Sequence, residues 1–320
     1  MTNRRRLVSL SVDLDELDCY RAIHGLGDGA GETPIYDRGV PRFAERFARE
    51  GVQATFFVVG RDAQRPERAA RLRELAAAGH ELANHSLSHD YALVRRNPSV
   101  IVAEVSGGRA AIADAVGIAP VGFRAPGYTL STDLVEILAD LDVAYDSSVL
   151  PSPAYFAARS AAIVGKALLG RRSRSLFGGF DLALAPRRPY YLTWPPFRRR
   201  EERVGDRGGL RELPIAVLPW VRLPVIGTSL VLAGPAQAAR LCRLLRHEFF
   251  VNLEFHGIDL CAPDDPGLGA LAGHQPDATL PLARKQDTLS AVIRTFRDAG
   301  AEFVTLARAA DLAFQKPLKS

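Results

Sequence analysis

The sequence predicts an α/β fold, and two observations support that prediction. Short runs of β-forming residues alternate along most of the chain with longer stretches whose apolar residues recur at helical spacing. Polar candidates for a functional site come at or just after the ends of the short runs, where barrels and open α/β folds place their chemistry. The chain has 320 residues, of which 47% are hydrophobic, and we expect one domain over residues 1–320.

The first half of the chain follows this alternation closely. The first predicted strand, Leu7 to Leu14, leads into two acids two positions apart, Asp13 and Asp15, which a strand would direct to one face. Residues 16–34 are acidic and rich in glycine, which indicates a surface loop beside that face. Helices are expected over 39–50, 65–78, 98–116 and 131–141, the last with Ser131 as its N-cap, and strands over 53–59, 81–84, 121–123 and 143–145.

Residues 151–211 interrupt the alternation, and we interpret them as an insertion. Their first part predicts a helix over 153–169 with one apolar face, formed by Tyr155, Phe156, Ile163, Val164, Ala167 and Leu168. A stretch rich in proline, arginine and aromatic residues follows and includes Trp194. The α/β pattern then resumes, with strands over 213–217, 250–255 and 302–306 and helices over 235–247 and 285–299.

Positive charge is concentrated in this insertion. The whole chain has a formal net charge of +5, but residues 159–203 contain eleven Arg or Lys against three acidic residues. Together with the apolar helix face, this excess predicts an amphipathic, basic segment in peripheral contact with an anionic membrane. The alternative is a helix that packs as ordinary core. No recognisable nucleic-acid motif accompanies the arginines, so we expect no nucleic-acid partner.

The cysteine content and the hydropathy of the chain indicate its cellular location. Cys19, Cys242 and Cys261 match no metal-ligand spacing, and an odd number of cysteines leaves one unpaired in any disulfide scheme. No apolar run has the length of a signal peptide core or a membrane-spanning helix. We therefore expect a cytoplasmic protein, at most peripheral on the cytoplasmic face of the inner membrane.

The candidate site is organised around His85 and His89 in the run His-Ser-Leu-Ser-His. Two imidazoles four positions apart can bind one metal ion from a single turn of backbone, although such a pair alone is weak evidence. Other candidate residues along the chain strengthen the prediction of a metal site. Asp13 and Asp15 precede the pair, and three further candidates follow it in the order Arg124, Asp146 and His256.

In that order these residues resemble the motifs of the polysaccharide deacetylase family with NodB homology. The resemblance covers about residues 7–150 and 212–306 and implies an incomplete, distorted (β/α)7-type barrel that carries residues 151–211 as an insertion. It also implies a metal-dependent enzyme that hydrolyses an N-acyl group, acetyl or formyl, from an amino sugar. A branch that acts on lipid-linked sugars or glycolipids fits the basic, amphipathic insertion.

The resemblance assigns the metal ligands and the general base. Asp15, His85 and His89 would bind one divalent ion, by default zinc, with cobalt, nickel, manganese and iron as alternatives. Asp13 would be the general base, oriented and held ionised by Arg124.

The remaining motifs would supply the acid and the substrate contacts. His256 would protonate the leaving amine, with Asp146 as its partner. A backbone N–H just after Pro126 would stabilise an oxyanion. Substrate contacts are expected from Gly127, Tyr128 and Trp194, in addition to Pro126.

Departures from the family pattern leave alternatives open. One residue separates Asp13 from Asp15, where the usual motif has adjacent acids, and Glu16 is the substitute if Asp15 is not a ligand. The usual tryptophan after the Asp146 motif is absent, so its apolar wall would come from elsewhere, with Trp194 and Trp220 available.

Two other functions compete with this interpretation. One is a metal-dependent amidohydrolase that acts on a small cyclic amide or ureide. The other is a non-catalytic carbohydrate- or lipid-binding module, which would have little reason to keep all of the candidate side chains. The shape of the site separates the enzyme classes, since a polysaccharide needs a long open groove and a small amide fits a short one capped by the insertion.

Overall fold

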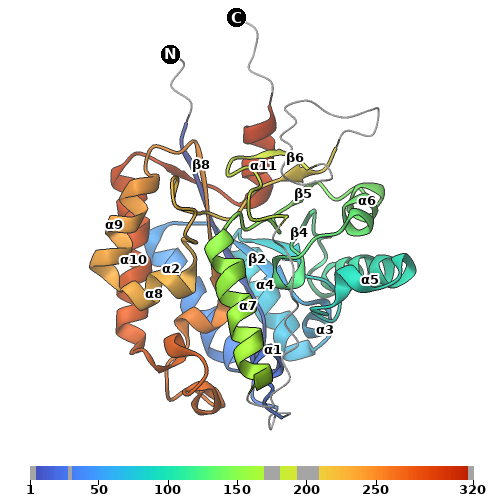
Figure 1. Ribbon diagram of the computed structural model, residues 1–320, viewed down its shortest axis with the longest axis horizontal. Coiled ribbons are helices and arrows are strands. Elements are labelled where there is room, and N and C mark those ends of the chain that lie inside the picture. The colour runs from blue at the N-terminus through green and yellow to red at the C-terminus, as the bar shows by residue number, and fades with distance from the viewer. Residues whose placement is uncertain (1–4, 28–30, 169–180, 193–208, 316–320) are drawn as a thin grey trace, which may run out of the picture.

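The computed structural model describes residues 5–27, 31–168, 181–192 and 209–315. A curled half-barrel sheet forms its centre (Figure 1), with the strand order β6-β7-β5-β4-β3-β2-β1-β8 and with β9 beside β1. All pairings are parallel except that of β6 with β7. The strands are β1 (Leu7–Asp13), β2 (Thr55–Val58), β3 (Glu81–Asn84), β4 (Gly122–Phe123), β5 (Tyr145–Asp146), β6 (Tyr190–Tyr191), β7 (Arg211–Glu212), β8 (Phe250–His256) and β9 (Glu302–Phe303).

Helices cover the sheet from two sides. In Figure 1, α2, α9 and α10 lie on one side of the strands, α5 and α6 lie on the other, and α7 runs across the front. The α-helices are α1 (Leu17–His24), α2 (Val40–Glu50), α3 (Gly60–Ala63), α4 (Pro66–Ala77), α5 (Pro98–Val116), α6 (Thr132–Asp140), α7 (Pro153–Leu168), α8 (Gly227–Ala233), α9 (Pro235–Leu245), α10 (Leu282–Asp298) and α11 (Leu306–Phe314). The α/β alternation predicted from the sequence is confirmed.

The largest hydrophobic core lies between the sheet and its first layer of helices. Phe43 and Phe47 of α2 are fully buried there against Phe255 of β8 and Phe56 of β2, with ring centroids 6.2 and 6.1 Å apart. Burial of aromatic side chains of this size contributes on the order of 2–3 kcal/mol each, which fixes the strands that carry the site.

A glycine lets helix α5 pack closely against β3, the strand that precedes the two histidines. Gly108 lies in the middle of α5, and a Cβ built there would stand 2.4 Å from Asn84 Oδ1 and 2.8 Å from the backbone of Ser86. Only glycine permits that approach, and the Asn84 side chain uses it to donate a hydrogen bond to Val105 O at 2.8 Å. The helix-weakening glycine in α5 therefore positions the residues that follow β3.

The surface loop predicted over residues 16–34 is wrong in its first part, where α1 forms. Glu16 is buried, and its carboxylate accepts hydrogen bonds from the backbone N–H groups of Leu17, Ile35 and Tyr36 at 2.8, 3.2 and 3.2 Å. Glu16 thus caps α1 and joins it to the turn that leads into α2. The acid that made this stretch look solvent-exposed is the residue that starts the helix.

The strand predicted over 213–217 is also corrected, because regular pairing ends at Glu212 in β7. The chain beyond it still crosses between two strands. Leu213 N–H donates to Asp146 O at 2.9 Å, and Ala216 N–H donates to Asn252 O of β8 at 2.8 Å. This irregular segment is therefore hydrogen-bonded to both β5 and β8.

The predicted helix in the insertion is present as α7, but only part of its apolar face is buried. Phe156 is fully buried and Tyr155 is half-buried, whereas Val164 and Leu168 are exposed, Leu168 to 83%. Residues 169–180 and 193–208, which contain Trp194 and most of the predicted basic cluster, lie outside the described residues. Within the described ranges, no helix combines the length and the hydropathy needed to cross a membrane.

Candidate active site

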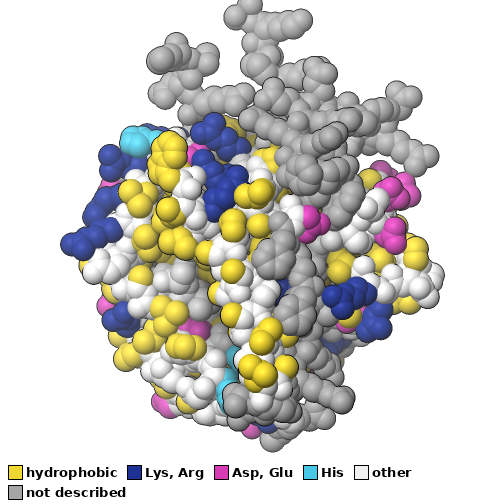
Figure 2. Space-filling model, in the orientation of Figure 1, with side chains coloured by type: hydrophobic (Ala, Val, Ile, Leu, Met, Phe, Trp, Pro, Cys, Tyr) yellow, Lys and Arg dark blue, Asp and Glu magenta, His cyan; other side chains and the backbone are white. Residues whose placement is uncertain are grey.

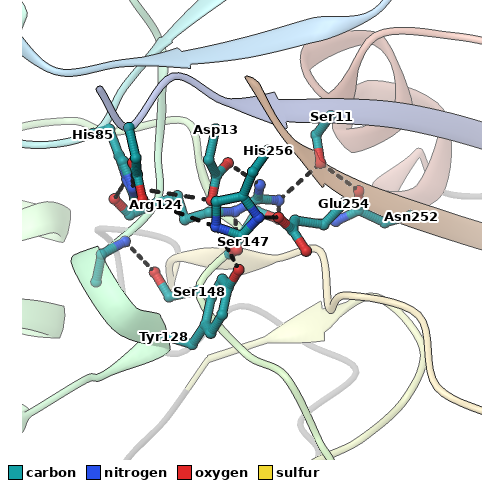
Figure 3. Close-up of polar contacts among 12 residues, drawn as sticks. Ser11, Asp13, His85, Arg124, Tyr128, Ser147, Ser148, Asn252, Glu254 and His256 are labelled. Carbon is teal, nitrogen blue, oxygen red and sulfur yellow. Dashed lines mark hydrogen bonds and ion pairs between the residues drawn. The ribbon is translucent and has the colours of Figure 1, made fainter. Parts of the chain in front are cut away.

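The ends of four parallel strands bring the candidate residues together. Asp13 ends β1 and lies in register with His256 at the end of β8. His85 directly follows β3, and Arg124 directly follows β4. Figure 3 shows these four side chains converging. The prediction that strand ends carry the site residues therefore matches the arrangement.

The turn that holds the two histidines has an unusual backbone. Ser86 and His89 both have positive φ angles, 64° and 57°, which residues other than glycine rarely adopt. Hydrogen bonds hold the turn: His89 N–H donates to Ser86 Oγ at 3.0 Å, and Ser88 Oγ donates to Glu104 of α5 at 2.8 Å. The turn thereby directs both imidazoles toward Asp15.

Asp15, His85 and His89 form a compact, buried cluster of ligand-type atoms. Asp15 Oδ1 lies 3.3 Å from His85 Nε2 and 3.2 Å from His89 Nε2. His85 Nδ1 donates to Arg124 O at 2.7 Å, which fixes the ring and directs Nε2 into the cluster. Burial alone would raise the pKa of Asp15, but His89 and His85 hold it well below its usual range.

The unsatisfied atoms of this cluster fit a divalent metal ion. Asp15 Oδ1 and His89 Nε2 are buried and have no hydrogen-bond partner among the described residues. Buried polar atoms without a partner are costly, and a cation is one way to satisfy them. Two imidazoles and one carboxylate are a common donor set for zinc and for other transition metals. Glu16 is not part of the cluster, because its carboxylate caps α1.

Arg124 anchors the second carboxylate of the site. It is fully buried, and its Nη1 donates to Asp13 Oδ1. Its other donors bind Ser11 Oγ at 3.0 Å, Ser147 Oγ at 2.9 Å and Ser147 O at 2.8 Å, so the guanidinium cannot turn away (Figure 3). Burial raises the pKa of Asp13 above its usual range, and the opposing charge of Arg124 only partly offsets that effect.

His256 is paired with Glu254, a residue that the sequence analysis missed. Glu254 Oε1 lies 2.8 Å from His256 Nδ1, while Nε2 points toward Asp15 Oδ2 at 3.9 Å and the Tyr128 hydroxyl at 3.5 Å. Burial lowers the pKa of His256, but Glu254 outweighs this effect and raises it well above its usual range. The strand spacing was the available signal, because residues two apart on β8 share a face.

The predicted pairing of Asp146 with His256 is wrong. Asp146 is buried deeper in the sheet, where it accepts a hydrogen bond from Ser148 Oγ at 2.7 Å and pairs with the carboxyl group of Glu212. Ser148 Oγ also accepts from the backbone N–H of Ala125 at 2.8 Å. Asp146 therefore supports the loop after Arg124 and does not reach the imidazole of His256.

Asp13, Glu254 and His256 make a second group with metal-ligand spacing. Each of its charges already has a protein partner, since Asp13 binds Arg124 and Glu254 binds His256. This second group is better described as an acid–base arrangement than as another metal site.

A cavity of about 330 Å³ opens onto both groups. Its polar floor contains Asp13, Asp15, His85 and His256. Its walls are mostly aromatic and aliphatic and are formed by Tyr20, Ile23, His24, Tyr91, Gly127, Tyr128, Tyr155, Arg159, Ala162, Ile163, Ile226 and Thr228.

The lining residues include some of the residues predicted to contact the substrate and leave others out. Gly127 and Tyr128 line the cavity, whereas Pro126 is buried and is not among the lining residues. Trp194 lies outside the described residues, and Trp220, the other candidate for the apolar wall, is 94% exposed and away from the lining. Tyr155 and Ile163 of α7 supply that wall instead.

Comparison with known proteins finds a family match for one part of the chain. The family model described as polysaccharide deacetylase matches residues 28–145, which include His85, His89 and Arg124. Residues 28–145 of this chain therefore resemble the polysaccharide deacetylase family. Asp13, Asp15 and His256 lie outside the matched span, and the sheet brings them to the same cavity.

Two curated proteins resemble parts of this chain. A chitooligosaccharide deacetylase from Sinorhizobium fredii is 33% identical over 85 residues, which are 24% of this chain and 37% of that protein. A peptidoglycan deacetylase from Helicobacter pylori is 26% identical over 156 residues, which are 45% of this chain and 50% of that protein. The chain thus spans half or less of the length of the curated relatives it matches.

Solved structures share the fold over nearly the whole chain. A Mycobacterium smegmatis structure that carries the polysaccharide deacetylase name superposes with a TM-score of 0.58 at 18% identity, covering 98% of this chain and 92% of that one. A mutant of a carbohydrate esterase family 4 pseudoenzyme gives a TM-score of 0.51 at 12% identity, covering 98% of this chain and 69% of the other. Because the second is called a pseudoenzyme, the fold alone does not decide activity.

Proposed function

We propose that this protein hydrolyses the N-acyl group of an amino sugar in a reaction that depends on one divalent metal ion. The observation that carries the proposal is a single cavity whose floor joins the buried Asp15–His85–His89 cluster to the Arg124–Asp13 and Glu254–His256 pairs. A carbohydrate-binding module needs none of these buried charges, and keeping them without use is costly.

Asp15, His85 and His89 would hold the ion, with zinc as the default metal. When bound, such an ion supplies Lewis acidity, which polarises a carbonyl oxygen and lowers the pKa of a water molecule. His85 is pre-oriented for this role by its hydrogen bond to Arg124 O.

Two residues on adjacent strands carry out the proton transfers. Asp13 takes a proton from the attacking water at its carboxylate, which Arg124 holds in place. His256 donates a proton from Nε2 to the departing nitrogen, and Glu254 keeps Nδ1 protonated and the ring directed at the cavity. Asp13 and His256 are register neighbours, so the base and the acid stand on the same side of the cavity floor.

The shape of the cavity supports a small or terminal amino sugar as the substrate. Tyr155, Arg159 and Ile163 place the inserted helix α7 along the cavity wall, where the interior of a long polysaccharide would have to pass. The exposed side chains of Val164 and Leu168 continue outward on the same helix and could contact an apolar aglycone. We therefore propose a lipid-linked amino sugar or glycolipid as the substrate class.

The capped cavity also favours a second candidate, the small cyclic amide or ureide. A cavity of about 330 Å³ accepts such a ring as readily as one sugar unit. The two candidates differ in the products that a substrate screen would detect.

We also propose that residues 1–320 form one domain, into which 151–211 is inserted. The support is that β5 and β7, which flank the inserted segment in sequence, pair within the same sheet through Asp146 and Glu212. A cytoplasmic location, with the inserted segment at the inner membrane, completes this proposal.

The test combines metal analysis with a substrate screen. The protein should bind one divalent ion per chain, and it should release acid from N-acetyl or N-formyl amino sugars, free or lipid-linked, in preference to cyclic amides. Asp15→Asn should lose the ion and the activity. Asp13→Asn should keep the ion and lose at least about 100-fold in kcat, because a general base contributes about that much.

The outcomes separate the candidates. Turnover of cyclic amides alone would assign the second function. Absence of metal binding in supplemented protein would contradict the enzymatic proposal as a whole. Loss of metal from Asp13→Asn would reassign Asp13 as a ligand.

A further inference from the structure

An exposed apolar tip lies outside the cavity and combines a loop that follows the insertion with one turn inside it. Trp220 is 94% exposed at the end of a tight loop, and its neighbours Val221 and Leu223 are exposed as well. Leu184, at 65% exposure, belongs to a separate turn. We call these four residues the Trp220 tip. An isolated exposed apolar side chain is ordinary, but four together that include an almost uncovered tryptophan mark an interaction surface.

The tip is built as a rigid feature. Leu218 N–H donates to Leu223 O at 2.9 Å, and Arg222 N–H donates back to Leu218 O at 3.0 Å. Arg222 has a positive φ of 51°, which shows that the loop holds a backbone shape most residues avoid.

The Arg222 side chain ties the two halves of the tip together. Its Nη1 donates to Ala185 O at 2.8 Å and to Ala183 O at 3.2 Å, the two carbonyls that flank Leu184. The same guanidinium reaches Pro151 O at 3.4 Å, just before α7. Leu184 is thereby fixed beside the Trp220 loop, and both are fixed to the start of the helix that lines the cavity.

Positive charge surrounds the tip. Arg187 and Arg188 follow Leu184 closely and share one acid, Glu248, at 3.6 and 3.1 Å. Arg222 adds a further cation, and Asp181 is the acid in the turn that carries Leu184. Figure 2 shows Lys and Arg side chains beside hydrophobic side chains on the face that it draws.

We propose that the Trp220 tip inserts into the headgroup region of an anionic lipid surface. A tryptophan with exposed aliphatic neighbours suits the interface between headgroups and acyl chains, and the adjacent arginines suit anionic headgroups. A protein partner would bury an apolar patch as well, but the excess of arginines over acids favours a negatively charged surface. The proposal goes beyond the catalytic function and assigns the main contact to the Trp220 loop, which follows residues 151–211.

The Trp220 tip lies close in sequence to residues that line the cavity. The chain runs from Leu223 directly to Ile226 and Thr228, both of which line the cavity. A protein docked through the tip would hold the cavity close to the lipid surface, so an amphiphilic substrate could reach it without leaving the membrane.

The test uses the full chain and vesicles of stated composition. Flotation with phosphatidylcholine vesicles containing 30% phosphatidylglycerol, roughly the anionic fraction of a bacterial inner leaflet, should recover the protein, and tryptophan emission should shift to the blue. Trp220→Ala should lower the partition coefficient about tenfold, since burial of that side chain supplies most of the apolar contact. Ile118→Ala removes an exposed aliphatic side chain that follows α5, and it should float like the unmodified protein.

The other outcomes are equally informative. Equal flotation of the unmodified protein and Trp220→Ala would overturn the proposal, as would flotation with neutral vesicles only. A dimer in solution that Trp220→Ala dissociates would assign the tip to a second copy of the chain. Because Trp220 does not line the cavity, metal content and hydrolysis of a water-soluble substrate should remain unchanged in this variant, which separates a failure here from a failure of the proposed function.

Discussion

Glu254 shows how a single side chain can decide the role of its neighbour. It is fully buried, and a buried carboxylate is stable only with a partner, which His256 provides at 2.8 Å. The pair directs Nε2 at the cavity and keeps Nδ1 occupied. His256 therefore has one nitrogen available for proton transfer.

Glu254→Gln should uncouple this pair with little change in shape. We expect kcat to fall about 100-fold, since an amide no longer favours the protonated imidazole, while metal content stays at the level of the unmodified protein. Steady-state kinetics and metal analysis of the purified variant provide the check. An unchanged kcat would show that Glu254 has no role in proton transfer. Loss of metal would show that Glu254 helps to hold the metal ligands in place.

Sequence reasoning reached most of the site residues but not all of their partners. The spacing of Asp13 and Asp15 and the His-Ser-Leu-Ser-His run identify the side chains, because each lies at the end of a strand. The partner of His256 was misassigned to Asp146, since the order of motifs along the chain does not reveal which carboxylate a curled sheet turns toward the ring. The alternation along β8 would have indicated Glu254.

At the scale of elements, α7 joins the insertion to the site. Its first turn packs Phe156 into a core with residues of α5 and α6, while Tyr155 and Arg159 lie against the loop that carries Gly127 and Tyr128. Arg159 Nη1 donates to Gly127 O at 2.7 Å. The sequence predicted this helix and its apolar face, but periodicity cannot divide that face between core, cavity wall and solvent.

Two substitutions on α7 should separate these environments. Phe156→Ala removes a fully buried ring and should lower the free energy of unfolding by about 3–5 kcal/mol. Val164→Ala, on the exposed part of the same helix, should change it by less than about 0.5 kcal/mol. Urea denaturation followed by circular dichroism measures both. A small effect of Phe156→Ala would mean that α7 is not part of the folded core.

At the scale of the whole molecule, the sheet encloses a carboxyl pair. Glu212 of β7 and Asp146 of β5 are fully buried neighbours, and Val149 N–H donates to Glu212 Oε1 at 3.1 Å. Burial first, and then the adjacent charge of Asp146, raise the pKa of Glu212 well above its ordinary value of 4.5. The folded protein therefore keeps this proton at pH values where the unfolded chain has released it.

This proton makes stability depend on pH with a definite sign. The contribution of Glu212 is complete below pH 4.5 and is lost as the pH rises toward and through the raised pKa. Glu212→Gln retains a hydrogen-bond donor without titrating. Relative to that variant, the unmodified protein should lose about 1.4 kcal/mol per pH unit within this window. Urea titrations from pH 5 to pH 8 measure the difference. Parallel pH profiles for the two proteins would contradict the raised pKa of Glu212.

The pairing of β1 with β8 has a consequence for how the chain folds. Ser11 and Asn252 bond to each other at 3.1 Å across 241 positions of sequence, and β1 lies between β2 and β8. Contacts of such long range slow folding, because a large loop must close before they form. During synthesis, β1 can pair with β2 early, yet its other edge stays open until β8 has left the ribosome. We expect the nascent chain to rely on chaperones over that interval and to bring His256 beside Asp13 only after β8 has docked.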